Sequence, residues 1–159
     1  MSVYETSTFE PRVSLELPAG WASHHEGATF FSVHRPLAAP EHGGPIWEVA
    51  VQVASLEVDE APGDVIDGLE DNPSLEVGRV GAAELDGAEG IRVDVEATTE
   101  SPVVSFPGGS LAAFPGRKLR VYAVDVDGRT VVLVVDAATE RFEEDVEAAE
   151  PVLESIDFS

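Results

Sequence analysis

Apolar and polar positions alternate most clearly toward the carboxyl end of the chain. Two β-rich runs, Leu119–Val126 and Arg129–Val135, flank the dipeptide Asp127-Gly128. Asp-Gly between such runs predicts a two-residue hairpin, because a type I′ turn needs a positive φ at both central residues. On one side the facing pairs would be Val126 with Arg129, Val124 with Val131, and Tyr122 with Leu133. The other side would carry Val121, Ala123, Val132 and Val134. Since both sides are apolar in the middle, we expect a central pair of strands that is covered on both faces.

Shorter runs predict the rest of the sheet. They are Arg12–Leu17, Thr29–Arg35, Ile46–Leu56, Leu75–Leu85 and Ile91–Ala97. In the first run Val13, Leu15 and Leu17 share one face, which is typical of a half-buried strand. The composition of residues 36–45 predicts a loop, and Asp86–Gly90 is expected to join the last two runs. Together these runs predict an antiparallel meander.

Two segments follow helical spacing instead. Asp64–Asp71 repeats apolar residues four apart and has Pro62 near its start, which predicts a short helix. A second helix is predicted from about Thr139. Its apolar positions are Phe142, Val146, Ala149 and Leu153, and its polar positions are Glu143, Glu144, Glu147 and Glu150. Pro151 is expected to kink this helix or to start a new turn.

Composition and charge place limits on the partners. With 159 residues, 43% of them hydrophobic, the chain has the size of one globular domain. We expect residues 1–10 to be a loosely held, flexible segment and residues 11–159 to form a single domain. The formal net charge of −22 disfavours nucleic acid and anionic membranes as partners. The carboxylates are spread along the chain, which favours a solubilising surface over a docking surface for a basic partner, and both alternatives stay open.

The sequence also bears on the compartment. No apolar run approaches the roughly 20 residues of a membrane helix, so membrane insertion is not expected. The start of the chain has no basic stretch followed by an apolar one. This predicts a cytoplasmic protein, or a secreted or lipoprotein-derived one whose signal was removed. There is no cysteine, and hence no thiol nucleophile or thiolate metal ligand.

Histidines are the first candidates for a metal site. The chain has His24, His25, His34 and His42. If the chain turns at Glu26-Gly27, His24 lies opposite about Thr29, and the rise of a strand puts it roughly 16–17 Å from His34. That separation is too large for two ligands of one ion, and no spaced motif such as HExxH is present. Surface or interfacial histidines are therefore favoured.

Catalytic and phosphate-binding motifs are incomplete. The run Asp125–Gly128 resembles the start of a calcium loop, but Arg129 and Thr130 stand at positions 5 and 6, where a ligand and a glycine are needed. Gly116-Arg117-Lys118 lacks P-loop spacing, and Ser110 lacks the trailing glycine of GxSxG. Nothing singles out a carboxylate pair among the 31 acidic residues. We therefore expect a protein that is not an enzyme, with no catalytic residue, metal or cofactor.

Residues 99–117 hold three prolines, three glycines and two phenylalanines without clear periodicity, which predicts a long loop. Long loops in compact domains are often functional, so segment 101–117 and the neighbouring sheet edge are the candidate site. Phe106 and Phe114 would form a satellite cluster on the sheet, which is the favoured alternative, or a recognition surface. The recognition hypothesis adds Arg117 and Trp47, although Trp47, like Trp21, fits a core position better.

The order of the elements and two short motifs resemble a known family. Pro18-Ala19-Gly20-Trp21 follows the first strand, and the final helix runs into Ser155-Ile156-Asp157-Phe158. With the meander and the long hairpin, these features are similar to the Mog1/PsbP-like superfamily over about residues 8–158. The resemblance implies an α+β fold, an α/β/α sandwich whose central antiparallel sheet has six or seven strands.

The resemblance also implies a class of function. Members of the superfamily are mostly non-catalytic, and include a Ran-binding transport factor, extrinsic photosystem II subunits and bacterial lipoproteins. This chain lacks a transit peptide and a lipobox cysteine, and its composition resembles that of a GC-rich prokaryote, which argues against a Ran-related role.

Two hypotheses follow from these expectations. The leading one is a non-enzymatic accessory or protein-binding module with an unidentified protein partner. The alternative is a carrier of a small apolar ligand or lipid, with a pocket under segment 101–117 lined by Phe106, Phe114 and Trp47. An acidic-site hydrolase is a weaker third possibility, and a homodimer is left open.

Overall fold

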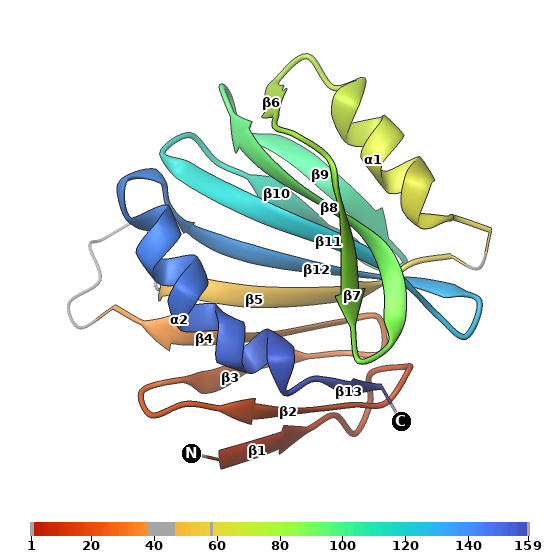
Figure 1. The fold of residues 1–159 in the computed structure, drawn as a ribbon, viewed down its shortest axis with the longest axis vertical. Helices are drawn as coiled ribbons and strands as arrows, with labels where there is room; N and C mark the ends of the chain where they lie inside the picture. The colour runs from red at the N-terminus through yellow and green to blue at the C-terminus, as the bar shows by residue number, and fades with distance from the viewer. Residues whose placement is uncertain (1, 38–46, 58, 159) are drawn as a thin grey trace.

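The computed structural model describes residues 2–37, 47–57 and 59–158 of the chain (Figure 1). In these residues one large antiparallel sheet has the strand order β3-β4-β5-β12-β11-β8-β6, and β7 also pairs with β8. The strands are β3 (Ala22–Glu26), β4 (Phe30–Pro36), β5 (Trp47–Ser55), β6 (Leu75–Val77), β7 (Gly81–Leu85), β8 (Ala88–Ala97), β11 (Arg117–Val126) and β12 (Arg129–Ala138). Because β6 and β7 follow one another along the same edge of β8, these eight strands make a sheet seven strands wide.

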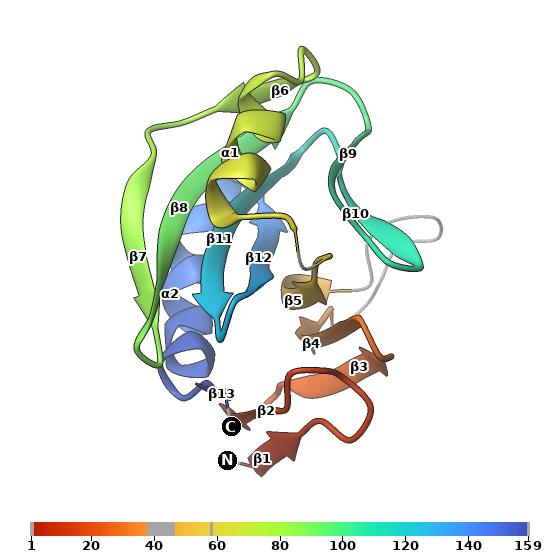
Figure 2. The ribbon, with the colours of Figure 1, turned by 90° about the vertical axis from the view of Figure 1, so that its right-hand side faces the viewer.

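Both faces of the sheet are covered. On one face lie helix α2 (Phe142–Glu154), preceded by the short helix η1 (Thr139–Arg141), and a small sheet in the order β1-β2-β13. Its strands are β1 (Ser2–Glu5), β2 (Val13–Leu17) and β13 (Asp157–Phe158). On the other face lie helix α1 (Pro62–Glu70) and the hairpin of β9 (Ser101–Phe106) and β10 (Gly109–Ala113). Figure 2 shows α2 and the β9–β10 hairpin on opposite sides of β11 and β12. The α/β/α sandwich is thus confirmed.

The central hairpin β11–β12 has the predicted register. Val124 pairs with Val131 and Tyr122 with Leu133 across the ladder. Val124, Val131 and Leu133 belong to the core beneath α2, whereas Val121, Ala123, Val132 and Val134 belong to the core beneath α1. One ribbon therefore separates two apolar cores, as its apolar residues on both sides predict.

Segment 101–117 is not an irregular loop, and that prediction is wrong. β9 and β10 form a hairpin that turns at Pro107-Gly108, where Gly108 has a φ of +98°. The register shifts between Leu111 and Ala112, and Pro102 lies within β9. A bulge and a proline both disrupt the two-residue periodicity of a strand, which is why the sequence pattern looks irregular.

Two Asp-Gly hairpin turns lie within the described part of the chain. Asp127 and Gly128 have φ values of 52° and 85°, and Asp86 and Gly87 have φ values of 50° and 77°. At the first turn the backbone N–H of Gly128 donates to Asp125 Oδ1 at 2.8 Å, so the resemblance to a calcium loop reflects a hairpin turn. At the second, β7 ends and β8 begins directly beside the turn, so the predicted five-residue connection is in fact two residues long.

Both ends of the chain contribute to the core beneath α2. Residues 2–10, predicted to be loosely held, include β1 and bury Phe9, whose side chain is 1% exposed. Helix α2 buries its four predicted apolar positions and continues through Pro151 to Glu154. No helix in the described residues is long and apolar enough to cross a membrane.

Candidate functional site

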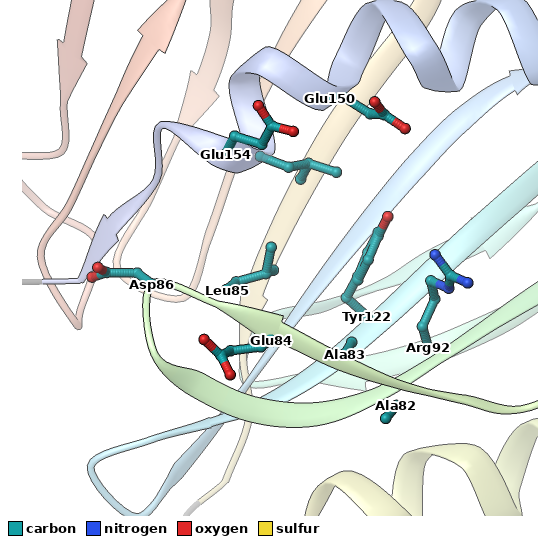
Figure 3. A pocket seen from close by; sticks show the side chains of 10 residues that line it. Ala82, Ala83, Glu84, Leu85, Asp86, Arg92, Tyr122, Glu150 and Glu154 are labelled. Carbon is teal, nitrogen blue, oxygen red and sulfur yellow. The ribbon is translucent and has the colours of Figure 1, made fainter.

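A cleft of about 420 Å³ lies between strand β7 and the carboxyl-terminal half of α2 (Figure 3). We call it the α2–β7 cleft. Its lining comes from β7 and the following turn, from Arg92 of β8, from Tyr122 of β11 and from the last turns of α2. The Asp86-Gly87 turn folds β7 back onto β8 and so presents one face of β7 to the helix.

The floor of the cleft is mainly apolar. It is formed by Ala83 and Leu85 from β7, Tyr122 from β11 and Leu153 from α2. Leu85, Tyr122 and Leu153 also belong to the core beneath α2, and all three are more than nine-tenths buried. The floor is therefore a continuation of the core that reaches the surface between the strand and the helix.

The rim of the cleft is strongly acidic. Glu84 and Asp86 lie on the β7 side, and Glu150 and Glu154 on the α2 side. Asp86 is partly engaged, because its Oδ2 accepts a hydrogen bond of 2.9 Å from the backbone N–H of Phe158. Arg92 is the single cation of the lining, and it forms no salt bridge with another described residue. The lining thus carries four carboxylates and one guanidinium, and the Glu84 side chain points from β7 away from α2 (Figure 3).

Tyr122 places a polar group at the bottom of the cleft. The residue is 8% exposed, and Figure 3 shows its hydroxyl pointing toward α2. Burial raises the pKa of this hydroxyl, and the guanidinium groups of Arg120 and Arg92 offset only part of the rise. Arg120 is itself held by Asp94, with nitrogen–oxygen distances of 2.8 and 3.1 Å. The Tyr122 hydroxyl is therefore neutral at pH 7, with a proton to donate.

These groups suit the binding of a cationic side chain. An apolar floor with a carboxylate rim accepts an aliphatic stem that ends in a cation, such as a lysine or arginine side chain. Within residues 2–37, 47–57 and 59–158, no group of three or more His, Asp or Glu side chains is arranged to hold a metal ion.

The four residues that the sequence predicts as a site lie away from the α2–β7 cleft. They are on or near the face of the main sheet that α1 and the β9–β10 hairpin cover. The Phe106 ring stacks on Phe30 with centroids 5.5 Å apart, and Phe114, after β10, is 45% exposed. Trp47 packs at the start of β5 against two histidines. Arg117 donates to Asp136 Oδ1 at 2.8 Å and to the backbone oxygen of Glu48, the residue next to Trp47, at 3.3 Å.

The Arg117–Asp136 pair is internal. Asp136 is almost fully buried, and its burial raises the pKa of its carboxyl group while Arg117 opposes the rise. The guanidinium of Arg117 is thus committed to a buried partner. Phe114 is, of the four predicted residues, the one whose side chain is largely open to solvent.

The predicted separation of His24 and His34 is wrong. Their ring centroids lie 4.9 Å apart, and Trp47 lies about 6 Å from both. The ladder pairs His34 with Ala22, and a register shift between Ser23 and His25 places His24 in a bulge. Burial lowers the pKa of His34, and His24 lowers it further. His42 and the predicted loop at 38–45 lie outside the described residues.

Sequence reasoning missed the α2–β7 cleft, although two of its signals are present in the sequence. One is the second Asp-Gly turn, and the other is the acidic face of α2, which continues to Glu154. What the sequence lacks is any indication that the strand and the helix, some 70 residues apart, converge.

Comparisons with known proteins show the fold. No family model matches the chain, and no curated protein sequence matches it. Among solved structures, the Ran-binding protein Mog1p of Saccharomyces cerevisiae is similar over 99% of this chain and 96% of its own, with a TM-score of 0.54 and 9% identity. A point mutant of Mog1 gives the same values. The cyanobacterial PsbP protein of Synechocystis sp. PCC 6803 is similar over 99% of this chain and 93% of its own, with a TM-score of 0.50 and 13% identity. The chain therefore has the Mog1/PsbP-like fold.

Proposed function

We propose that the protein is a non-catalytic protein-binding module that receives a basic segment of its partner in the α2–β7 cleft. The observation that carries the proposal is the combination, in one cleft of about 420 Å³, of an apolar floor and the rim carboxylates of Asp86, Glu150 and Glu154. A lysine or arginine side chain meets both requirements, because its aliphatic stem packs on the floor while its cation pairs with the rim.

The fold and the charge of the molecule support the same class of function. Mog1p, which has this fold, is described as a Ran-binding protein, so the fold accommodates a protein-binding role. The net charge of −22 gives the molecule a field that attracts basic partners and repels acidic ones. The α2–β7 cleft is where we expect a basic partner to dock.

A ligand carrier is the second candidate. The cleft volume lies within the roughly 300–1,000 Å³ of small-molecule sites. The charged rim favours a ligand with a cationic group over a purely apolar one. For partner contact, the surface around Phe106 and Phe114 is an alternative location to the cleft, because Phe114 is exposed.

A charge-neutralising pair of substitutions tests the cleft. The probe is a fluorescein-labelled peptide of alternating arginine and valine, and its binding is measured by fluorescence polarisation. We expect Glu150→Gln with Glu154→Gln to weaken binding roughly tenfold, the combined effect of two ion pairs worth about 0.2–1 kcal/mol each.

The matched control is Glu143→Gln with Glu147→Gln, which removes the same charge from the same helix outside the cleft. It is expected to change the affinity less than about twofold, because screening by salt limits charges at a distance. Equal weakening by both pairs would contradict the cleft as the site, as would no binding of the peptide to the unmodified protein.

A further inference from the structure

Strand β7 is an open edge of the main sheet. Among the described residues it pairs with β8 alone, in a register without a bulge, over five residues. β3, at the opposite edge, has a register shift, and β6 is three residues long. Natural edge strands are usually protected by bulges, prolines, lysines or shortness. Charged side chains also protect edges, and the β7 sequence, GAAEL, has one, Glu84, but no proline and no lysine.

The turn determines which backbone groups of β7 point outward. In a two-residue hairpin the residues that flank the turn, here Leu85 and Ala88, form a hydrogen-bonded pair, and such pairs alternate along the ladder. Leu85, Ala83 and Gly81 therefore direct their N–H and C=O groups toward β8. Ala82 and Glu84 direct theirs away from the sheet, where an added strand would find them.

The outer edge is also accessible and partly apolar. Ala82 and Glu84 are exposed, and Val80, just before β7, is 41% exposed. Small side chains leave the backbone open to approach. The α2–β7 cleft lies beside this edge and shares Ala82, Ala83 and Glu84 with it, so a strand added to β7 would direct alternate side chains toward the cleft.

The geometry points to recognition by strand addition: an extended basic segment of the partner pairs with the outer edge of β7 and inserts a lysine or arginine side chain into the α2–β7 cleft. This inference rests on the proposed function and adds the conformation of the partner. Main-chain hydrogen bonds would supply affinity and the cleft would supply specificity, which is the usual division in strand addition.

Charge identifies the occupant. The β7 side contributes Glu84 and Asp86 and the α2 side Glu150 and Glu154, so an added strand must neutralise carboxylates on both sides. A second copy of this chain would bring the same carboxylates and a net charge of −22 to the same edge. Like charges placed directly opposite each other are destabilising. The occupant is therefore a basic segment of another protein.

A proline at an outward-facing position tests the inference. Ala82→Pro removes one outward N–H and leaves the hydrogen bonds between β7 and β8 intact, because proline is tolerated where the N–H of an edge strand faces solvent. The comparison variant Ala82→Thr keeps the N–H and adds a β-branched side chain. With the arginine–valine peptide, we expect Ala82→Pro to weaken binding at least tenfold relative to the unmodified protein, and at least fivefold more than Ala82→Thr does.

Amide hydrogen exchange on the unmodified protein gives a second readout that needs no variant. Saturating arginine–valine peptide is expected to slow exchange at Ala82 and Glu84 at least tenfold. Ala83 and Leu85, which face β8, should change little. The same measurement on the Ala82→Pro protein shows whether the variant keeps the β7–β8 ladder, since the amides of Ala83 and Leu85 must then stay protected.

The outcomes separate the two proposals. Unchanged exchange at Ala82 and Glu84 would overturn strand addition, and so would full affinity in a folded Ala82→Pro variant. If Glu150→Gln with Glu154→Gln still weakens binding in that case, the cleft remains the site and only the strand mode is wrong. If the cleft pair has no effect either, both proposals fail. If the protein without peptide sediments as a dimer and its Ala82 and Glu84 amides are protected from exchange, the occupant of the β7 edge is a second copy of this chain.

Discussion

Gly90 is a position where the sheet has no room for a side chain. It lies on β8 opposite Val124 of β11. A Cβ atom built at Gly90 would lie 1.9 Å from the backbone oxygen of Ala123 and 2.7 Å from the Cα atom of Val124. Both neighbours are backbone atoms of a core strand, so they cannot rotate away as the end of a side chain would.

We predict that Gly90→Ala lowers the free energy of unfolding by roughly 2–3 kcal/mol, because the strands must separate to admit the methyl group. Gly68→Ala is the matched control. Gly68 lies in α1 with open space where its Cβ would be, so alanine there should raise the stability by up to about 1 kcal/mol. Urea denaturation of the three proteins measures both differences, and a Gly90→Ala protein as stable as the unmodified one would contradict the close approach.

Glu26 holds the amino-terminal segment against the sheet. Its carboxylate accepts hydrogen bonds from the Tyr4 hydroxyl and from the backbone N–H groups of Ser7, Thr8 and Phe9. Burial would raise the pKa of Glu26, but these hydrogen bonds outweigh it and lower the pKa to about 2. A carboxyl group with a lowered pKa stabilises the folded state only while it is ionised.

The sign of the pH dependence follows from that shift. The stabilisation from Glu26 is fully present above its unfolded pKa, near 4.5, and is lost as the pH falls toward 2. We predict that Glu26→Gln is less stable than the unmodified protein at pH 6 and that the difference narrows between pH 4.5 and pH 2. Thermal unfolding of both proteins across this pH range tests the prediction. If the difference in stability between them did not vary with pH, the loss in Glu26→Gln would come from packing and not from the carboxylate charge.

At the scale of elements, one ionic cluster ties α2 to the sheet. Arg35 of β4 donates to Glu48 of β5 at 2.7 Å and to Asp145 of α2 at 2.9 Å. Asp145 is 1% exposed. Arg141 is the second cation beside it, with Nη2 of Arg141 3.7 Å from Oδ1 of Asp145. The sequence pattern of α2 does not reveal that one of its acidic residues faces inward.

We predict that Arg35→Met lowers the free energy of unfolding by about 3 kcal/mol, because it leaves the buried Asp145 carboxylate without its shorter ion pair. Adding Asp145→Leu should recover most of that loss, since an apolar pair of similar volume often replaces a buried ion pair without cost. Denaturant titration of the single and double variants gives both values. A double variant no better than Arg35→Met would show that the ion pair is not the cause.

The elements that the sequence predicts well share one property: a strong local signal agrees with the tertiary environment. The β11–β12 hairpin has β-branched residues on both faces and an Asp-Gly turn, so its register follows from the turn alone. The β7–β8 hairpin has the same turn, but GAAEL lacks β-branched residues, and the turn was expected to be longer. The β9–β10 hairpin combines a proline with a bulge, and its periodicity is lost.

At the level of the molecule, the candidate site could not be predicted from the sequence because its residues come from distant segments. The α2–β7 cleft joins four elements between residues 82 and 154, and each contributes residues that look ordinary in isolation. The predicted distance between His24 and His34 is wrong for a similar reason, because a single bulge in β3 brings His24 beside His34. Fold follows from many repeated local signals, whereas a site depends on a few contacts between distant segments.

The bond between the Phe158 backbone N–H and Asp86 has a practical consequence. It fastens the carboxyl-terminal strand to the tip of the β7–β8 hairpin, at the mouth of the cleft. Ser2 pairs with Leu17 and Phe158 with Val13, so the two termini lie at opposite ends of β2. An affinity tag or surface tether joined after residue 158 would thus crowd the entrance, whereas one attached at the amino terminus would leave it open for capture experiments.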